Sequence, residues 1–423
     1  MKNVDIVFSA FLDSIIGPVQ TLRRISRNKQ FFLENGFCLN LFTLDCLYDL
    51  SSKQASSQAT KQISKFQKIK HYFINELKQL AFYLSQHSLF YSAIRIQLLF
   101  MPSKKVLKYY MGQNRAADII VFHSIYDCYV YLKYYKQAGT KVSLFIHADS
   151  ATPSMLLIYF KKAKGTIVER KLNRIHEYVL SNVDIINSIS RIGEQNFIKE
   201  YPFIKGKTNL IVNGIDDLSD DQQKELKRDV QTEKNSKYRL ITVGSLNGRK
   251  GHDIIIEALL KLPDNLKEKL EVLFVGDGPK RKQYEELVEK ESLGHIVKFV
   301  GSVPNNKVYK YLANADIYIL MSYNEGLPLS MLEAIRGGLP VISTKVSGIP
   351  EIVEDKFNGL LINPNSDELL KIFQEIENYD WNSFGINSRA RFEKLFTFAR
   401  MRQDYLNMLF TLSSNKESTE GEK

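Results

Sequence analysis

The 423-residue sequence contains three cysteines and no long apolar run, and these two shortages narrow the class of protein. Cys38, Cys46 and Cys128 are an odd number without metal-ligand spacing, so we expect reduced packing residues rather than a disulfide framework. No run approaches the roughly 20 apolar residues that cross a bilayer. The N-terminal segment carries Asp5 within a strand-like stretch, unlike a signal peptide. The sequence therefore predicts a cytoplasmic protein.

Motifs of metal and cofactor chemistry are also missing. The chain has no Asp-x-Asp pair and no His/Cys/Asp/Glu cluster with metal-ligand spacing, so we expect no metal. It has no Gly-x-x-x-x-Gly-Lys-Ser/Thr phosphate loop, and no Gly-x-Gly-x-x-Gly follows the first strand-like segment. These absences argue against ATPases and dinucleotide-binding proteins, and we expect no cofactor.

Acidic residues are scarce in the first half of the chain. Residues 1–210 hold 29 Lys and Arg against 14 Asp and Glu, a net charge of +15, whereas residues 211–423 hold 29 against 33, a net charge of −4. A basic domain suits an anionic partner such as a membrane surface, nucleic acid or a phosphorylated acceptor. A merely soluble basic face is the alternative. No nucleic-acid recognition motif is present, so we expect no nucleic acid partner.

Short apolar segments alternate with helix-like stretches in both halves of the chain. This alternation predicts βαβ units, and hence parallel sheets with helices on both faces. We expect an α/β fold of two Rossmann-like doubly wound domains facing a cleft. The strand-like segments are residues 4–9, 38–44, 118–122, 141–147, 183–190 and 208–216, then 239–244, 271–275, 297–300, 316–321 and 340–343.

The regions between these segments are less regular. Residues 19–34 are expected to form one helix, and the amphipathic stretch 63–84 suits either a core-facing helix or an interfacial membrane helix. The expected domains are residues 1–216 and 238–412, with a last helix that could cross back to the first domain. Residues 217–237 lack apolar periodicity and are expected to be a linker, and residues 413–423 a disordered tail.

Two glutamates eight residues apart, Glu325 and Glu333, are the most informative feature of the sequence. An apolar strand-like run ends at Met321 before them, and a helix could begin at Pro328. A strand-loop-helix junction of this kind offers a phosphate the free N–H groups of a helix N-terminus. Two carboxylates beside such a pocket suit hydroxyl-rich groups, such as a sugar and a ribose. Two surface glutamates of a helix are the structural alternative.

The glutamate pair is part of a longer run of motifs. Glu325-Gly-Leu-Pro-Leu-Ser-Met-Leu-Glu333 is followed by Gly337-Gly-Leu-Pro-Val-Ile-Ser-Thr, by Gly348-Ile-Pro-Glu-Ile-Val and by Asn358-Gly-Leu-Leu-Ile-Asn-Pro364. Over residues 238–364 this run resembles the donor-binding half of the retaining glycosyltransferases of family 4, of the bacterial polysaccharide type, which have the GT-B fold. The resemblance implies that the second domain binds a nucleotide-sugar donor and the first an acceptor.

A second strand-loop-helix junction carries two cations, Arg249 and Lys250, after the strand that ends near Gly244. Cationic side chains beside a helix N-terminus stabilise the negative charge of a departing nucleoside diphosphate. An exposed basic turn is the alternative. By resemblance, Lys250 matches the lysine of the family, whereas Ser245 stands where the family usually has arginine. Either Arg249 reaches the diphosphate instead, or the site is weaker than usual.

The resemblance implies roles for further residues. Glu333 would accept hydrogen bonds from the ribose, Glu325 would contact hydroxyls of the transferred sugar, and backbone amides around Gly326 and Leu327 would assist. The backbone at Gly301 would, by resemblance, lie along the base. Gly276 and Gly278 form a lone Gly-x-Gly, which mostly marks a tight turn near a ligand.

In the first half, His147 ends an apolar strand and Gly17 lies in the first strand-helix turn. A lone histidine in that position is more often structural, but the family often uses one there to contact the transferred sugar. Gly17 partly matches a turn that lets the backbone approach the diphosphate or the acceptor. These residues complete the predicted site.

We therefore expect a retaining, metal-independent glycosyltransferase. Its donor is expected to be a nucleotide-diphosphate sugar, a UDP-sugar being favoured, and its acceptor a glycan or lipid-linked glycan of capsule, exopolysaccharide or cell-envelope biosynthesis. The basic first half suits peripheral attachment to the inner face of an anionic membrane. The alternative is a catalytically silent GT-B protein that binds a glycan or supports a partner enzyme, motivated by Ser245.

Overall fold

A computed structural model describes residues 1–12, 14, 17–47, 84, 87–147, 157, 160–226 and 237–414. The chain divides into two compact units. Unit 1 comprises residues 1–188, 194–210 and those from 406 onward, and unit 2 comprises residues 189–193 and 211–405. The amphipathic stretch 63–84 lies outside the described residues except for Leu84.

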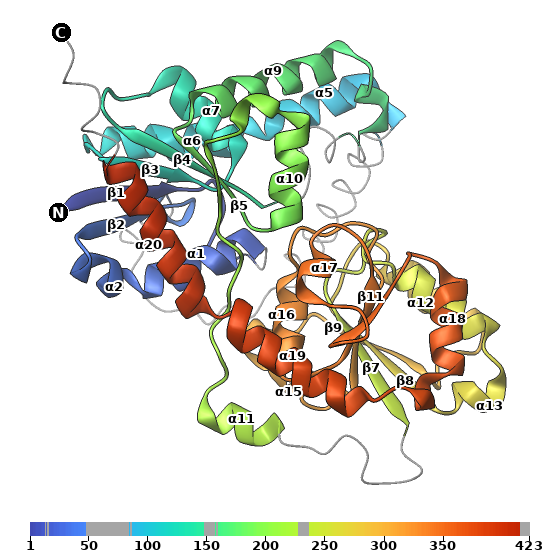
Figure 1. The fold of residues 1–423 in the computed structure, drawn as a ribbon. Helices are drawn as coiled ribbons and strands as arrows, with labels where there is room; N and C mark the ends of the chain where they lie inside the picture. The colour runs from blue at the N-terminus through green and yellow to red at the C-terminus, as the bar shows by residue number, and fades with distance from the viewer. Residues whose placement is uncertain are drawn as a thin grey trace, which may run out of the picture. The chain divides into compact units, whose positions relative to one another are not determined.

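Unit 1 is built on a six-stranded parallel sheet with the order β2-β1-β3-β4-β5-β6 (Figure 1). Its central strand β3 is a continuous apolar run, and all four of its residues are buried, as parallel strands covered on both faces require. The strands are β1 (Lys2–Val7), β2 (Phe37–Phe42), β3 (Ile119–Phe122), β4 (Lys141–Ile146), β5 (Ile185–Ser188) and β6 (Thr208–Leu210).

Helices cover both faces of this sheet. One face packs α6, α7 and α9 into an apolar core with the strands, and the other carries α1, α2 and the end of α20 (Figure 1). Ser124 begins α7 because its Oγ accepts from the N–H groups of Tyr126 and Asp127. The helices are α1 (Gly17–Arg27), α2 (Lys29–Glu34), α5 (Leu89–Leu98), α6 (Phe100–Gly112), α7 (Ile125–Tyr134), α9 (Ile167–Asn182), α10 (Arg191–Glu200) and α20 (Phe398–Ser414), the last shared with unit 2.

Unit 2 has a second six-stranded parallel sheet, with the order β12-β11-β10-β7-β8-β9. Read from β9, this is the 3-2-1-4-5-6 order of the Rossmann fold. The strands β10 and β11 are fully buried. The strands are β7 (Tyr238–Val243), β8 (Leu270–Val275), β9 (Val297–Gly301), β10 (Ile317–Leu320), β11 (Val341–Thr344) and β12 (Gly359–Ile362).

The helices of unit 2 also form two layers. One layer contains α12, α14 and α18, and the other α15, α16, α17 and α19. The helices are α11 (Asp220–Leu226), α12 (His252–Lys261), α13 (Asp264–Lys267), α14 (Arg281–Lys290), α15 (Asn305–Leu312), α16 (Leu329–Arg336), α17 (Ile349–Ile352), α18 (Ser366–Gln374) and α19 (Trp381–Leu395). Both units therefore have the expected doubly wound α/β architecture.

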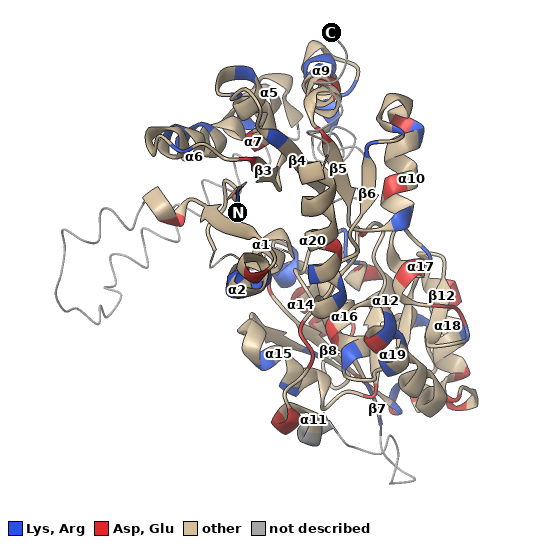
Figure 2. Cartoon of the chain, turned by 60° about the vertical axis from the view of Figure 1, so that its left-hand side comes forward, with Lys and Arg blue, Asp and Glu red and all other residues tan. Residues whose placement is uncertain are grey.

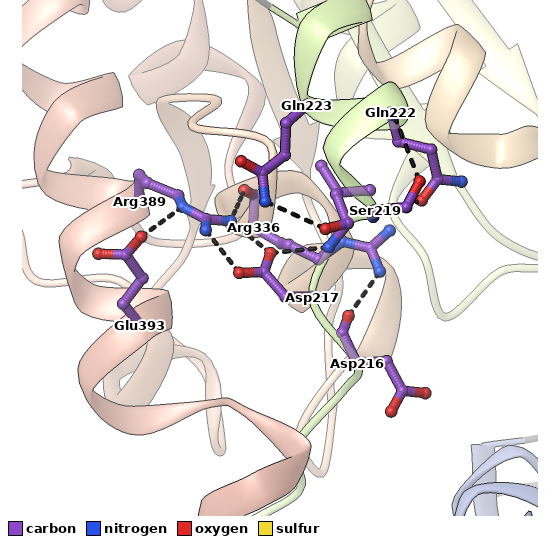
Figure 3. Close-up of polar contacts among 9 residues, drawn as sticks. Asp216, Asp217, Ser219, Gln222, Gln223, Arg336, Arg389 and Glu393 are labelled. Atoms are coloured by element: carbon purple, nitrogen blue, oxygen red, sulfur yellow. Dashed lines mark hydrogen bonds and ion pairs between the residues drawn. The ribbon is translucent and has the colours of Figure 1, made fainter.

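Polar contacts tie Asp216 and Asp217 to α16 and α19 (Figure 3). Arg389 on α19 binds both carboxylate oxygens of Asp217 at 2.6 Å and also donates to the backbone oxygen of Arg336. Arg336, at the end of α16, donates to the backbone oxygen of Asp216 over 2.8 Å. A bidentate arginine-carboxylate pair is among the stronger polar contacts. The C-terminal end of α16 is thereby fixed to two other segments of unit 2.

Several expected elements differ in the structure. The expected helix 19–34 is interrupted at Asn28, whose side chain donates to the backbone oxygen of Arg24 and so competes with the helix. A short helix, α11, lies within the expected linker, where apolar periodicity is absent. Ser413 and Ser414 of the expected tail still belong to α20, while residues 415–423 lie outside the described part.

The described residues include no helix long and apolar enough to cross a membrane. They also include no group of three or more His, Cys, Asp or Glu side chains that could hold a metal ion. The three cysteines are free. Lysines and arginines line α6 and α9 of unit 1 (Figure 2).

Candidate functional site

Two loops of unit 2 meet where the strand order of its sheet reverses. The strands β7 and β10 are neighbours, but the strands that follow them in the chain lie on opposite sides. Such a switch point leaves a crevice at the carboxyl ends of the strands, where ligands bind in open parallel sheets. The loop after β7 holds residues 244–251, and the loop after β10 holds residues 321–328. Lys250 and Glu325 therefore lie in the two loops that flank this point.

One carboxylate and two cations join these loops. Lys250 Nζ lies 2.6 Å from Glu325 Oε1, and Arg249 Nη1 lies 3.2 Å from Glu325 Oε2. Ser322 Oγ donates to Glu325 Oε1 over 2.9 Å. The side chains of Glu325 and Lys250 are 6% and 11% exposed. The pair of Glu325 and Lys250 is therefore largely removed from water, whereas the side chain of Arg249 is 32% exposed.

Glu325 is ionised in spite of its burial. Burial alone would raise the pKa of Glu325, but the charges of Lys250 and Arg249, with hydrogen bonds from Lys250 and Ser322, outweigh it and hold the pKa below its usual value. A carboxylate has about four lone-pair sites. The contacts with Lys250, Arg249 and Ser322 occupy three of them. The remaining capacity suits a hydroxyl donor.

Arg249 is held by the glutamate loop. Its Nη1 also donates to the backbone oxygen of Asn324 over 3.0 Å, and the N–H of Tyr323 donates to the backbone oxygen of Arg249 over 2.9 Å. Ser245, where the resemblance leads us to expect arginine, is exposed. A guanidinium has five N–H donors, so these contacts leave most of them for a ligand.

Glycines line the carboxyl edge of this sheet. Gly244 N–H donates to the backbone oxygen of Val275, and Gly276 N–H to that of Gly301, each over 2.9 Å. A Cβ on Gly276 would stand 1.9 Å from the oxygen of Gly244, so no other residue fits there. The structure thus brings the predicted Gly244, Gly276 and Gly301 together. Because these three positions carry no side chain, a ligand can approach the backbone there closely.

Glu333 lies on α16, one turn after its start, and is half-buried. The charges of both predicted glutamates affect the buried Tyr318. The hydroxyl of Tyr318 forms a hydrogen bond with Ser330 Oγ over 2.8 Å. Burial, with the negative charges of Glu325 and Glu333, raises the pKa of Tyr318 above its usual value. The two carboxylates therefore lie within electrostatic reach of one buried hydroxyl.

Gly326 and Leu327 connect Glu325 to α16. Leu327 is buried, and the backbone oxygen of Gly326 is packed against Gly348 so closely that a Cβ there would stand 1.8 Å away. Gly348 N–H donates to the backbone oxygen of Glu325 over 3.3 Å. The glutamate loop is therefore held by Gly348, in addition to its contacts with Arg249 and Lys250.

The sheet of unit 1 has its own switch point, between β1 and β3. Gly17 begins α1, which follows β1, and His147 directly follows β4. Two carboxylates hold the turn after β1, since Ser9 N–H donates to Asp127 Oδ2 over 2.9 Å and Leu12 N–H to Asp45 Oδ2 over 2.8 Å. The turn that leads to Gly17 is thus anchored at two points.

The sequence alone did not indicate Ser322, Asp127 or His123 as site residues. His123 directly follows β3 and contacts His147, Nδ1 to Nε2, at 2.8 Å. Its place after an apolar strand, the same signal that singled out His147, could have found it. The sequence offers no comparable signal for Asp127, whose partner Ser9 comes from a distant segment. Ser322 lies only three residues before Glu325, so its place in the same loop could have suggested it.

The two sheets and their helices define a GT-B fold, and comparison with solved structures agrees. Sucrose-phosphate synthase from Thermosynechococcus elongatus is similar with a TM-score of 0.70 at 17% identity, over 98% of this chain and 100% of that one. Anabaena HepE in complex with UDP is similar with a TM-score of 0.63 at 18% identity, over 98% and 100%.

Sequence comparison finds relatives of the second half among glycosyltransferases. Residues 223–394 match the family described as Glycosyl transferases group 1, and this segment contains Lys250, Glu325 and Glu333. An uncharacterised glycosyltransferase of Methanocaldococcus jannaschii, MJ1069, is 28% identical over 62% of this chain and 64% of its own length. The TuaC protein of Bacillus subtilis, named as a teichuronic acid biosynthesis glycosyltransferase, is 40% identical over 31% of this chain and 30% of its own. Matches to the first three curated relatives span 64%, 44% and 55% of their lengths.

Proposed function

We propose that this protein is a glycosyltransferase that moves a sugar from a nucleoside-diphosphate donor to an acceptor hydroxyl. The observation that carries the proposal is the cluster of Lys250 and Arg249 around the buried Glu325 at the switch point of unit 2. The match of residues 223–394 to group 1 glycosyltransferases supports it, because the cluster lies inside that segment. A UDP-sugar is the donor we favour, since the similar HepE structure contains UDP.

In this reaction the bond between the sugar and the diphosphate breaks while a bond to the acceptor oxygen forms. The hydroxyl proton of the acceptor passes to the leaving diphosphate. Negative charge grows on the diphosphate, and preorganised cations there lower the barrier. Lys250 has three N–H donors, and its contact with Glu325 leaves two for phosphate oxygens. Arg249 adds a second positive charge to the same loop.

Glu325 and Glu333 complete the donor site in this proposal. The remaining lone pair of Glu325 accepts a hydrogen bond from a sugar hydroxyl, and Glu333 binds the ribose. The resemblance to family 4 supports retention of the anomeric configuration and a mechanism without a metal, with Lys250 and Arg249 serving in its place. Gly17 and His147 of unit 1 contribute to the acceptor or sugar contacts.

The proposed acceptor is a glycan or lipid-linked glycan of the cell envelope, at the inner face of the membrane. The relative named for teichuronic acid biosynthesis supports a polysaccharide pathway. The helices α5 and α6 support the membrane part, because α5 exposes Phe90, and α6 exposes both Met101 and its lysines. Absence of binding to anionic vesicles at low salt, where electrostatic attraction is strongest, would contradict attachment.

A catalytically silent GT-B protein that binds a glycan is the second candidate. Ser245 motivates it, but the intact cluster of Lys250 and Glu325 and the named relatives favour a catalytic role.

Thermal stabilisation by a panel of UDP-, GDP- and ADP-sugars tests the donor site. We expect one nucleotide class to raise the melting temperature of the wild type, and Lys250→Ala and Glu333→Ala to lose this rise. Lys261→Ala is the matched control, because Lys261 pairs with Asp367 on the surface of the same unit. Equal stabilisation of all four proteins would show that the nucleotide binds elsewhere.

A further inference from the structure

The switch point of unit 1 holds a pair of histidines. The strands β1 and β3 are neighbours, and the chain continues from them to opposite sides of the sheet. His123 directly follows β3, and His147 directly follows the neighbouring strand β4. Parallel strands end at the same edge, so the two rings meet where a ligand of this sheet is expected.

The geometry of the pair is well defined. His123 Nδ1 lies 2.8 Å from His147 Nε2. The His123 ring is 4% exposed and stacks on Phe145 with ring centroids 4.6 Å apart and an angle of 8° between the planes. His147 is less buried than His123. The inner ring is therefore fixed by packing, and the outer ring by its bond to the inner one.

The second ring nitrogen of His123 decides the direction of this bond. Its Nε2 is buried and has no hydrogen-bond partner among the described residues. Burial lowers the pKa of both rings, so each is neutral near pH 7, with one N–H and one acceptor nitrogen. If His123 accepted the shared hydrogen bond, its proton would be on Nε2 as a buried donor without an acceptor. Such orphaned N–H groups are rare, so His123 Nδ1–H donates to His147 Nε2.

We propose that His123 is a positioning residue that fixes His147 as its Nδ1–H tautomer. In a neutral imidazole the hydrogen bond at one nitrogen sets the proton on the other. His147 then presents an N–H donor to an oxygen of the sugar bound at the carboxyl edge of this sheet. The choice of a sugar as ligand rests on the proposed function, whereas the tautomer rests on the histidine pair alone.

Two substitutions separate the hydrogen bond from the packing of the ring. His123→Asn keeps an amide N–H at the position of Nδ1, while His123→Phe keeps the aromatic stack and removes the donor. Because Nε2 has no partner, phenylalanine should be tolerated in this apolar place. His176→Phe is the matched control, since His176 is also fully buried, with both ring nitrogens unpartnered among the described residues.

The first readout is the protonation of the two ring nitrogens of His147. It is measured by nitrogen NMR of histidine-labelled protein, and the signals of His147 are assigned by their loss in His147→Gln. Wild type, His123→Asn and His176→Phe should show a protonated Nδ1 and an unprotonated Nε2. His123→Phe should show a mixture of both tautomers. A protonated Nε2 in the wild type, or an unchanged spectrum in His123→Phe, would overturn the proposal. This readout needs no substrate.

The second readout is sugar transfer. We expect kcat of His123→Phe to fall about tenfold, the worth of one hydrogen bond, with KM for the donor nearly unchanged. His123→Asn should recover most of that loss, and His176→Phe should show none. If neither the wild type nor any variant transfers sugar, the proposed function fails, but the result on the tautomer of His147 still stands. If transfer is normal in His123→Phe, the positioning role is wrong.

Discussion

Glu325 carries a charge that the fold removes almost entirely from water. Its neighbours Lys250, Arg249 and Ser322 come from two loops that are far apart in the sequence. The motif around Glu325 indicates a ligand site, but it does not reveal that the carboxylate binds the very cations of the other loop. That pairing depends on β7 and β10 being neighbours, which local sequence patterns do not specify.

Glu325→Gln should destabilise the protein, because it leaves Lys250 as a nearly buried charge without its partner. We expect the free energy of unfolding in urea to fall by roughly 3 kcal/mol. Asp367→Asn breaks the exposed ion pair with Lys261. This substitution should change the free energy of unfolding by less than about 1 kcal/mol. Equal effects of the two substitutions would contradict the importance of burial at Glu325.

Lys280 offers a third positive charge near the loop after β7. The backbone N–H of Lys280 donates to the backbone oxygen of Leu246 over 3.0 Å. The side-chain Nζ of Lys280 lies 3.5 Å from the place that a Cβ on Gly248 would take. The diphosphate of the donor is proposed to lie at this loop, where Ser245 lacks a charge. This lysine was not among the residues singled out by the sequence.

Lys280→Ala should therefore weaken the binding of UDP by about three- to tenfold at low salt, and by less at high salt because salt screens exposed charges. Titration calorimetry at two salt concentrations measures this. Lys282→Ala is the control, since Lys282 is highly exposed and near Glu286. The same affinity for both variants would mean that Lys280 does not reach the nucleotide.

At the scale of elements, alternation of apolar segments predicted the strands well, because buried parallel strands are continuous apolar runs. It failed where local side chains decide. Asn28 splits the expected helix 19–34 by binding a backbone carbonyl of its own helix. The edge strand β12 was not anticipated, since only part of it is buried and the loop-like pair Asn358-Gly359 spans its start.

The loop after β7 has a further constraint at Gly251. Its φ is +66°, and a Cβ would stand 1.8 Å from the backbone oxygen of Met321. Gly251→Ala should push the two loops of the donor site apart and lower the free energy of unfolding by about 2–4 kcal/mol. Gly294→Ala meets nothing within 4 Å and should have little effect on unfolding in urea. A stable Gly251→Ala protein with normal nucleotide binding would contradict this account.

At the scale of the whole molecule, the two sheets have different strand orders but place their candidate residues by the same rule. In unit 2 the switch point holds Lys250 and Glu325, and in unit 1 it holds His123 near the turn after β1. The sequence could predict two parallel sheets and the motifs at their edges. It could not predict the strand orders, because these depend on contacts between distant segments.

Buried histidines should make the stability of the molecule depend on pH. Burial lowers the pKa of His176 to about 3, and burial with the charge of Lys250 lowers that of His252 to about 4. In the unfolded chain histidine titrates near 6.5. The unfolded state thus binds more protons between these values, so stability is full above pH 7 and falls as pH drops from about 6.5 towards 4.

Urea unfolding from pH 7 to pH 4.5 measures the slope of the free energy of unfolding against pH. His252→Phe should reduce it by up to about 1.4 kcal/mol per pH unit, the contribution of one proton. A slope that is the same in the variant and the wild type would show that His252 takes up no extra proton on unfolding.

Release of the nucleoside diphosphate from a sugar donor tests the central claim most directly. The wild type should release it from the donor that stabilises the protein, faster when an acceptor glycan is present. Lys250→Ala should release it at least a hundredfold more slowly, the loss seen when a preorganised charge is removed from a transition state, estimated as about 10²–10³. Equal release by Lys250→Ala, or none by the wild type with any donor, would contradict a catalytic cluster at this switch point.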